Sequence, residues 1–368
     1  MKNIALFSYD FHHRKTHDFI LDLVGSGVRG IVVLAAGIRK LDGVDSRSYF
    51  DESLRTCPPL LASELCARLG IPFFQVEHDD YSRIDQIVQE YCIDLAIISG
   101  ARIIKKEVIS LFPDGVINFH PGKLPETSGL DSLFYTLKNG VPAGVTTHFI
   151  DQRVDAGSEI YFDEVIVTAS STPETVKENI YQMQRVALRR VVSMLMQGCI
   201  PSRPIHRPAK NPPMTPEQKI EAVSRFATWR AARFTEQEYS RLMAAAESGD
   251  LMTVERILDK LPQLLGRKND SGWSPLIVAA YHGHLIVAEF LLKKGANPND
   301  TGLKGTTVLM YAKSRLLHSS ESSYALLDLL ISHGADVARC DCFGRTVLDY
   351  VSECGDQRMV QYFRGILQ

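Results

Sequence analysis

The sequence predicts two kinds of structure in one chain, a doubly wound, mostly parallel α/β sheet followed by an all-α repeat domain. Over about the first 200 residues, short apolar runs alternate with stretches whose apolar residues recur at helical spacing. Strands that alternate with helices are typical of a parallel sheet. In the last third, a Gly-x-Ser/Thr-x-Leu pattern begins at Gly272, recurs 33 residues later at Gly305, and recurs again at Gly344. A period of this length indicates stacked helical repeats.

The elements of the first part follow from apolar runs and their spacing. Expected strands are residues 4–8, 30–34, 73–76, 95–98, 116–120, 145–150 and 159–167. Expected helices are residues 17–24, 60–69, 84–91, 172–197 and 217–234. A Rossmann-like sheet built this way binds ligands at the carboxyl ends of its strands. Residues 201–216 are rich in proline, which predicts an extended crossing segment.

Composition limits the class of protein. The net charge is −2, which predicts no general attraction to nucleic acid or to a membrane surface. The seven cysteines show no C-x-x-C spacing, so we expect no metal site and free thiols in a reducing compartment. No apolar run reaches the length of a membrane span, and the start lacks a signal-peptide pattern. A soluble, cytoplasmic protein is expected.

Polar residues stand where the strand 116–120 ends. Asn118 and His120 are two residues apart, so their side chains project from the same face of the strand, and Pro121 stops the pairing. After the strand 145–150, a turn places Asp155 close to Gly157. An amide, an imidazole and a carboxylate are an oxyanion donor, a base and an orienting group for acyl transfer.

The first strand-to-helix loop, residues 8–16, contains no glycine. It is therefore neither a dinucleotide-binding nor a P-loop fingerprint. It carries His12 and Arg14 beside other basic residues, which leaves two interpretations open: a solvated basic loop, or a loop that meets an anionic substrate over the active site.

At these residues the chain resembles the formyltransferase family that uses 10-formyltetrahydrofolate. The matching segments are residues 99–104, 118–121, 144–148 and 154–157, in the family's order. The resemblance implies a formyltransferase fold and a catalytic triad of Asn118, His120 and Asp155. It also implies a folate site, with 10-formyltetrahydrofolate as co-substrate, no metal, and contacts from the following residues: Ser99, Gly100, Ile104, Ile150 and Asp151.

Three formyl acceptors are familiar in this family. The first loop lacks the glycine- and serine-rich phosphate loop of the glycinamide ribonucleotide members, and the helical last third replaces the basic barrel of the initiator-tRNA members. Residues 124–131 resemble the loop of sugar N-formyltransferases. We therefore favour a dTDP-linked 3- or 4-amino-dideoxyhexose for surface polysaccharide such as the O-antigen of lipopolysaccharide. The residues expected to contact this substrate are Lys123, His12, Arg14, Lys210 and Trp229. Initiator methionyl-tRNA remains an alternative acceptor.

The last third resembles ankyrin repeats. We expect a catalytic domain over residues 1–200, a crossing segment and helix over residues 201–238, and ankyrin repeats over residues 239–368. The repeats either stabilise the catalytic part or its dimer, or bind a ligand or partner; Trp273, expected on an exposed turn, marks a possible accessory site. A non-catalytic ankyrin interaction protein is the competing class. The apolar stripe of helix 172–197 is either core or the face of a homodimer.

Overall fold

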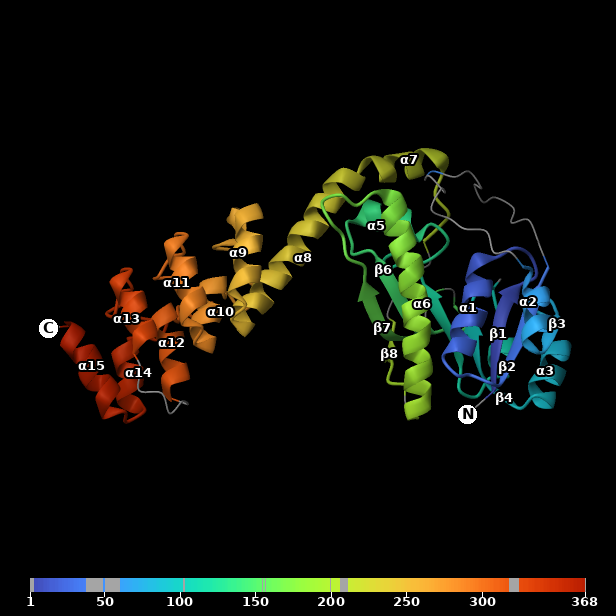
Figure 1. The fold of residues 1–368 in the computed structure, drawn as a ribbon, viewed down its shortest axis with the longest axis horizontal. Coiled ribbons are helices and arrows are strands. Elements are labelled where there is room, and N and C mark those ends of the chain that lie inside the picture. Colours follow the sequence, from blue (N-terminus) through green and yellow to red (C-terminus); the bar gives the residue numbers. More distant parts are fainter. Residues whose placement is uncertain are drawn as a thin grey trace. The chain divides into compact units, whose positions relative to one another are not determined.

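The protein is described by a computed structural model of residues 3–37, 49, 60–101, 103–153, 155, 157–198, 200–205, 211–317 and 324–367. The chain divides into two compact units, Met1–Arg233 and Phe234–Gln368 (Figure 1). Among the described residues, no helix has both the length and the apolar character needed to cross a lipid bilayer.

One mixed sheet forms the centre of the first unit. Its strands lie in the order β3-β2-β1-β4-β5-β6-β7-β8. The pairs from β3 to β5 are parallel, and those from β5 to β8 are antiparallel. The strand bounds are β1 Asn3–Tyr9, β2 Ile31–Ala36, β3 Phe73–Gln75, β4 Ile93–Ile98, β5 Val116–His120, β6 Gly144–Phe149, β7 Ser158–Glu164 and β8 Arg203–Pro204. This confirms the predicted α/β fold class, with its parallel part at the first five strands.

Helices cover both faces of the sheet (Figure 1). The helices of this unit are α1 Arg14–Gly25, α2 Ala62–Leu69, α3 Tyr81–Glu90, α4 Lys106–Ile109, α5 Ser132–Asn139, α6 Pro173–Gln197 and α7 Pro216–Ser224. One core cluster joins α1, α2 and α6 to the sheet, with Phe19 edge-on to Phe119. A second cluster joins α3 and α4 to β1, β2, β4 and β5 on the other face. Since this second cluster contains no residue of β6 or β7, the polar side chains of those strands on that face are left for a site.

Several predicted boundaries are corrected. The helix expected over residues 217–234 is two helices, α7 and α8 Phe226–Ser248, separated at Arg225. The break lets α7 bury Lys219 while Phe226 and Trp229 enter the first core cluster. The helix expected from residue 17 begins at Arg14, because His13 caps it by accepting from Thr16 N–H. The sequence patterns predict no helix at α4 or α5 and no strand at β8.

The second unit contains helix pairs with one continuous apolar core. Beyond the shared helix α8, its helices are α9 Leu251–Lys260, α10 Pro275–His282, α11 Leu285–Lys293, α12 Val308–Leu317, α13 Ala325–Ser332, α14 Val347–Glu353 and α15 Gln357–Leu367. The recurring sequence pattern has a physical explanation. Gly272, Gly305 and Gly344 each form a turn at positive φ, near +75°, which glycine adopts without strain. Two residues later, Ser274 and Thr346 cap the next helix.

Candidate active site

Strand β5 presents two polar side chains at its end. Phe119 is fully buried against α1, so the alternation of the strand turns Asn118 and His120 toward the opposite face. At β6 and β7, that face lies outside the second core cluster of the described residues. Gln184 of α6 donates to the carbonyl oxygen of Phe119 at 2.6 Å, which fixes the strand from behind.

His120 and Asp155 lie together at the centre of the site. Nδ1 of His120 is 3.3 Å from Oδ1 of Asp155, and His120 is 3% exposed. The other oxygen of Asp155 accepts from the backbone N–H of Gly129 at 2.6 Å. Asp155 has φ of 50°, a left-handed conformation that is unusual for a residue other than glycine. The turn after β6 therefore holds this carboxylate at some cost in backbone strain, which is typical of functional sites.

The surroundings of Asp155 keep it ionised. Burial alone would raise the pKa of this carboxyl group, but the charge and hydrogen bond of His120, the N–H of Gly129 and the charge of His148 together lower its pKa well below the ordinary value. Nε2 of His120 faces the carbonyl oxygen of Thr127 at 2.9 Å. The two ring nitrogens of His120 therefore face oxygen atoms of Asp155 and Thr127, which fix the orientation of the ring.

His148 is a site residue whose role the sequence left open. It is fully buried, pairs with Asn118 across β5 and β6, and its Nε2 is 3.2 Å from Nδ2 of Asn118. This contact orients the amide. The alternation in Thr146-Thr147-His148 carried a signal, because it puts Thr146 and His148 on one strand face, but the register that pairs His148 with Asn118 is a tertiary feature.

The loop after His120 is held by contacts that the sequence did not reveal. Thr146 Oγ1 accepts from Leu124 N–H at 3.0 Å and donates to the carbonyl oxygen of Gly122 at 2.7 Å. Ser132 Oγ lies 3.2 Å from Nε2 of His120. Asn211 donates from its side chain to the carbonyl oxygen of Glu126 at 3.0 Å. The proline-rich segment thus supports the catalytic loop from outside.

Two of the residues expected at a folate site point into the protein. Ser99 is 1% exposed, and its hydroxyl donates to the carbonyl oxygen of Phe7 at 3.0 Å. Ile104 is 5% exposed within the second core cluster. These two side chains therefore shape the loop after β4 from inside, and a contact of these residues with folate would be made through the backbone.

Gly100 was expected to let the loop approach a pterin. A Cβ atom there would lie 2.8 Å from ring atoms of both Tyr9 and His13. The close approach that requires glycine is therefore to these two rings. Ile150 packs partly against the second core cluster, and Asp151 accepts two hydrogen bonds from the Arg153 side chain and one from its backbone N–H. Backbone and partly exposed atoms of this turn remain available as one wall of a site.

The residues expected to contact the acceptor have different surroundings. Arg14 makes a two-pronged ion pair with Glu178 at 2.7 Å, and His12 is exposed on the same loop. Trp229 is 4% exposed, and its indole N–H donates to the carbonyl oxygen of Val141 at 2.9 Å. The expectation that Trp229 stacks on a base is corrected, because both ring faces are buried in core packing. Lys210 lies outside the described residues.

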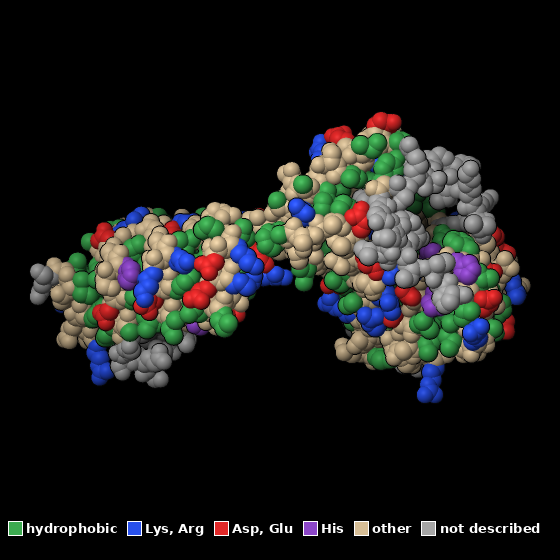
Figure 2. All heavy atoms as spheres, turned by 45° about the horizontal axis from the view of Figure 1, so that its top comes forward, with side chains coloured by type: hydrophobic (Ala, Val, Ile, Leu, Met, Phe, Trp, Pro, Cys, Tyr) green, Lys and Arg blue, Asp and Glu red, His purple; other side chains and the backbone are tan. Residues whose placement is uncertain are grey.

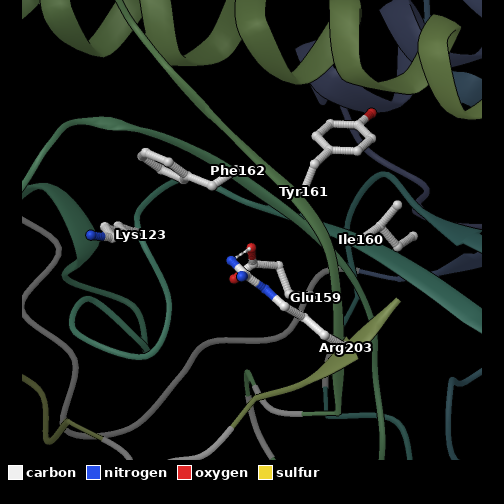
Figure 3. A pocket seen from close by; sticks show the side chains of 6 residues that line it. All are labelled: Lys123, Glu159, Ile160, Tyr161, Phe162 and Arg203. Atoms are coloured by element: carbon white, nitrogen blue, oxygen red, sulfur yellow. Dashed lines mark hydrogen bonds and ion pairs between the residues drawn. The ribbon is translucent and has the colours of Figure 1, made fainter. Parts of the chain in front are cut away.

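Lys123 borders a cavity of about 540 Å³ at strands β7 and β8 (Figure 3). The cavity is lined by Lys123, Glu159, Ile160, Tyr161, Phe162 and Arg203. Figure 3 shows the head groups of Glu159 and Arg203 together in the cavity, with the Tyr161 ring directed away from it. The Tyr161 hydroxyl donates to the carbonyl oxygen of Ala187 in α6.

Trp273, the expected marker of an accessory site, lies in a cluster of aromatic side chains in the second unit. Its ring centroid is 5.1 Å from that of Tyr281 and 4.9 Å from that of Tyr311. Its indole N–H donates to the hydroxyl of Tyr311 at 3.0 Å. Tyr281 is 39% exposed, so the cluster is accessible through this ring. Among the described residues, no group of three or more His, Cys, Asp or Glu side chains is arranged to hold a metal ion.

Family models match both units. Residues 58–192 match the formyl transferase family, and residues 221–302 and 242–327 match ankyrin repeats. The chain thus carries the domain of a formyl-transferring enzyme, followed by ankyrin repeats. The match to the first family contains Asn118, His120 and Asp155.

Curated relatives share only part of this chain. The chain is 28% identical over 142 residues to the trifunctional purine biosynthetic protein adenosine-3 of Gallus gallus, covering 36% of this chain and 14% of that protein. It is 27% identical over 177 residues to a methionyl-tRNA formyltransferase of Pelotomaculum thermopropionicum, covering 47% and 55%. The chain thus spans between about a seventh and about half of the length of these two relatives. Among solved structures, a sugar N-formyltransferase from a Shewanella species has a TM-score of 0.40 at 16% identity, with 58% of this chain and 76% of that chain covered.

Proposed function

We propose that the chain is an N-formyltransferase that moves a formyl group from 10-formyltetrahydrofolate to the amino group of a nucleotide-linked amino sugar. The observation that carries the proposal is the His120–Asp155 pair at the end of β5, inside the region that matches the formyl transferase family. The acceptor we favour is a dTDP-linked 3- or 4-amino-dideoxyhexose for surface polysaccharide.

The residues of β5 and of the turn after β6 have different roles in the proposed reaction. The co-substrate supplies the formyl carbon, which the neutral acceptor amine attacks. Asn118, oriented by His148, donates a hydrogen bond to the oxygen that becomes negative in the tetrahedral transition state. His120, held between Asp155 and the carbonyl oxygen of Thr127, exchanges a proton with the reacting amines. Asp155 stays ionised, orients His120 and stabilises its charge.

Two features of the chain favour a sugar nucleotide over the acceptors of the relatives. The loop of residues 8–16 lacks the glycines that cradle a ribonucleotide phosphate. A tRNA acceptor needs an extended cationic surface, whereas the net charge is −2 and Figure 2 shows acidic and basic side chains interspersed over the visible face of the second unit. A cavity that holds one lysine and one arginine beside an aromatic ring suits a compact anionic acceptor.

A turnover assay tests the proposal. Purified full chain is incubated with 10-formyltetrahydrofolate and, separately, with a panel of dTDP- and UDP-linked amino sugars, glycinamide ribonucleotide and methionyl-tRNA, and tetrahydrofolate release is followed. We expect turnover with one amino sugar nucleotide, and none with the last two acceptors. Release without any acceptor measures hydrolysis. Turnover with glycinamide ribonucleotide or methionyl-tRNA alone would replace the acceptor that we propose.

The competing class is an ankyrin interaction protein whose catalytic domain has lost activity. Its discriminating experiment is a double variant, Asn118→Ala with His120→Asn, in the producing cell. Loss of the formylated sugar with the protein level unchanged supports catalysis. Unimpaired biological function in that variant would favour the interaction protein.

We propose the aromatic cluster at Trp273 as an accessory site for a ligand or partner. We propose separately that the first unit forms a homodimer. Trp273 and Tyr281 offer a partly exposed aromatic surface in the repeats. A Tyr281→Ala variant, which removes the most exposed ring, should change the dependence of rate on acceptor concentration if the ligand is the acceptor itself. An unchanged dependence leaves no acceptor site there.

A further inference from the structure

A row of polar side chains crosses four strands from the catalytic residue to the edge of the sheet. Asn118 on β5 pairs with His148 on β6, His148 pairs with Glu159 on β7, and Glu159 pairs with Arg203 on β8. Directly paired residues of antiparallel strands project from the same face. Three strand spacings correspond to roughly 14 Å between the first and last backbone of the row. One compact ligand can therefore reach from Asn118 to the Arg203 head group.

The guanidinium of Arg203 is held in place but largely unused. Its Nη2 atom donates to Oε1 of Glu159 at 2.6 Å, and this is its only ion pair or hydrogen bond within the part of the chain that the structure describes. A guanidinium has five N–H donors in a planar fork, so most of them remain for a ligand. The Arg203 side chain is 78% exposed, whereas that of Glu159 is 12% exposed. The buried carboxylate thus anchors an exposed cation.

Lys123 supplies the second cation of the same cavity. It follows His120-Pro121-Gly122 directly, and its ammonium group is 3.9 Å from the Glu126 carboxylate, a loose contact between two partly exposed side chains. Lys123 and Arg203 line the cavity together (Figure 3). Two cations on separate elements, with most of their donors unused, are suited to the several oxygens of a phosphate or diphosphate group.

Phe162 gives the cavity an apolar wall. It pairs with Thr146 on the catalytic face of the sheet, and Gly144 leaves room for its ring, because a Cβ atom at Gly144 would lie 2.6 Å from it. A ring in this position can contact the apolar face of a sugar or a base. It takes the role that the sequence led us to expect from Trp229.

We propose that Arg203, held by Glu159, and Lys123 form an anion-binding pair that takes the phosphate groups of the acceptor, while Phe162 contacts its sugar or base. This inference deepens the proposed function and depends on it for the identity of the acceptor. The anion-binding pair places the negatively charged end of the acceptor at β8 and its amine at Asn118. Acceptors that lack a phosphate are then poor substrates.

Binding of inorganic pyrophosphate tests the pair without any turnover. Calorimetric titration is made on the full-length wild type and on the variants Arg203→Gln, Lys123→Gln and Arg190→Gln. Arg190 is a matched control, because it pairs with Asp163 of the same strand β7 at 3.1 Å and stacks on Tyr161. We expect wild type and Arg190→Gln to bind pyrophosphate, and the other two variants to bind about ten- to hundred-fold more weakly. Equal binding by Arg203→Gln and wild type, or no binding by the wild type at concentrations on the order of 10 mM, would overturn the inference.

Kinetics then separate this inference from the proposed function. With an acceptor from the panel, Arg203→Gln should raise the acceptor KM about ten- to hundred-fold at a similar kcat and an unchanged folate KM, and Arg203→Lys should recover part of the loss. Phe162→Leu should raise the KM of the nucleotide sugar while pyrophosphate binding stays the same. If formyl transfer occurs and Arg203→Gln keeps the wild-type KM for the acceptor, only the proposal of the anion-binding pair is refuted. If no amine is formylated, the proposed function fails, and pyrophosphate binding still decides whether the pair exists.

Discussion

The ammonium group of Lys219 in α7 lies 3.0 Å from Oδ1 of Asp131, and the two side chains are only 5% and 8% exposed. The other oxygen of Asp131 accepts from the N–H of Met214 at 2.7 Å. Asp131 directly precedes Ser132, whose hydroxyl contacts His120. This buried ion pair therefore fixes the end of the catalytic loop to a helix more than 80 residues further along the chain.

Lys219→Met should destabilise the first unit by about 3–5 kcal/mol, because it leaves a buried carboxylate without its cation. The double variant Lys219→Met with Asp131→Asn should recover much of that loss. Each unit holds one of the two tryptophans, so fluorescence of a Trp273→Phe background reports unfolding of the first unit through the buried Trp229. Single and double variants with the same unfolding midpoint as that background would show that the pair contributes nothing.

Asn118→Ala should lower kcat by about 10²–10³-fold, since it removes one donor to the developing oxyanion. The folate and acceptor KM values should change much less. Asp163→Asn serves as the control, because Asp163 lies on β7 and pairs with Arg190 away from the site. A kcat loss of less than about ten-fold in Asn118→Ala would remove Asn118 from the catalytic machinery.

Asp155 gives the stability of the first unit a defined dependence on pH. Its pKa is lower in the folded protein than in the unfolded chain, so its stabilising effect is complete above the unfolded value of about 3.9 and is lost as the pH falls toward the folded value. The difference in unfolding free energy between wild type and Asp155→Asn should therefore be constant from pH 7 to about pH 5 and shrink below about pH 4. Denaturant unfolding of both proteins in the Trp273→Phe background at pH 7, 5, 4 and 3 measures it. A difference that grows on acidification would contradict the lowered pKa.

Gly157→Ala should destabilise the first unit by at least about 2 kcal/mol and lower activity. The residue has φ of +96°, and a Cβ atom there would lie 2.1 Å from the carbonyl oxygen of Phe149. Gly198→Ala is the matched control, with φ of +91° and nothing within 4 Å of the added atom. It should cost only the conformational term of about 1–2 kcal/mol and leave kcat unchanged. Equal unfolding midpoints for the two variants would show that the turn after β6 relaxes freely.

The fold followed from local patterns, and the site followed from them only in part. Apolar runs located the strands β1, β2, β4 and β5, because these strands are buried on both faces, and helical spacing located the helix α6. The structure also brings Asp155 beside His120, as the resemblance to the formyltransferases predicts. The contact of Asn118 with His148 depends on strand register, and that of Asp131 with Lys219 depends on where a distant helix packs. Neither register nor docking is encoded by spacing alone.

Three residues expected to contact a ligand have buried side chains, which the sequence patterns did not predict. The residues are Ser99, Ile104 and Trp229, and the direction of each side chain is set by tertiary packing. The chain offers no local signal for that choice. The sequence patterns did not predict a ligand contact for Arg203 or Glu159. Strand β8 is only two residues long, and its pairing with β7 is a tertiary contact.

The change from parallel to antiparallel pairing at β5 has an evolutionary consequence. The residues proposed to handle the formyl group come from β5 and the turn after β6, whereas the proposed acceptor contacts include β7 and β8 at the edge of the sheet. Edge strands and loops tolerate insertions, deletions and changes of charge better than the central strands of a sheet. An enzyme lineage with this fold can acquire a new acceptor through mutations in the edge strands, while the residues that transfer the formyl group stay unchanged.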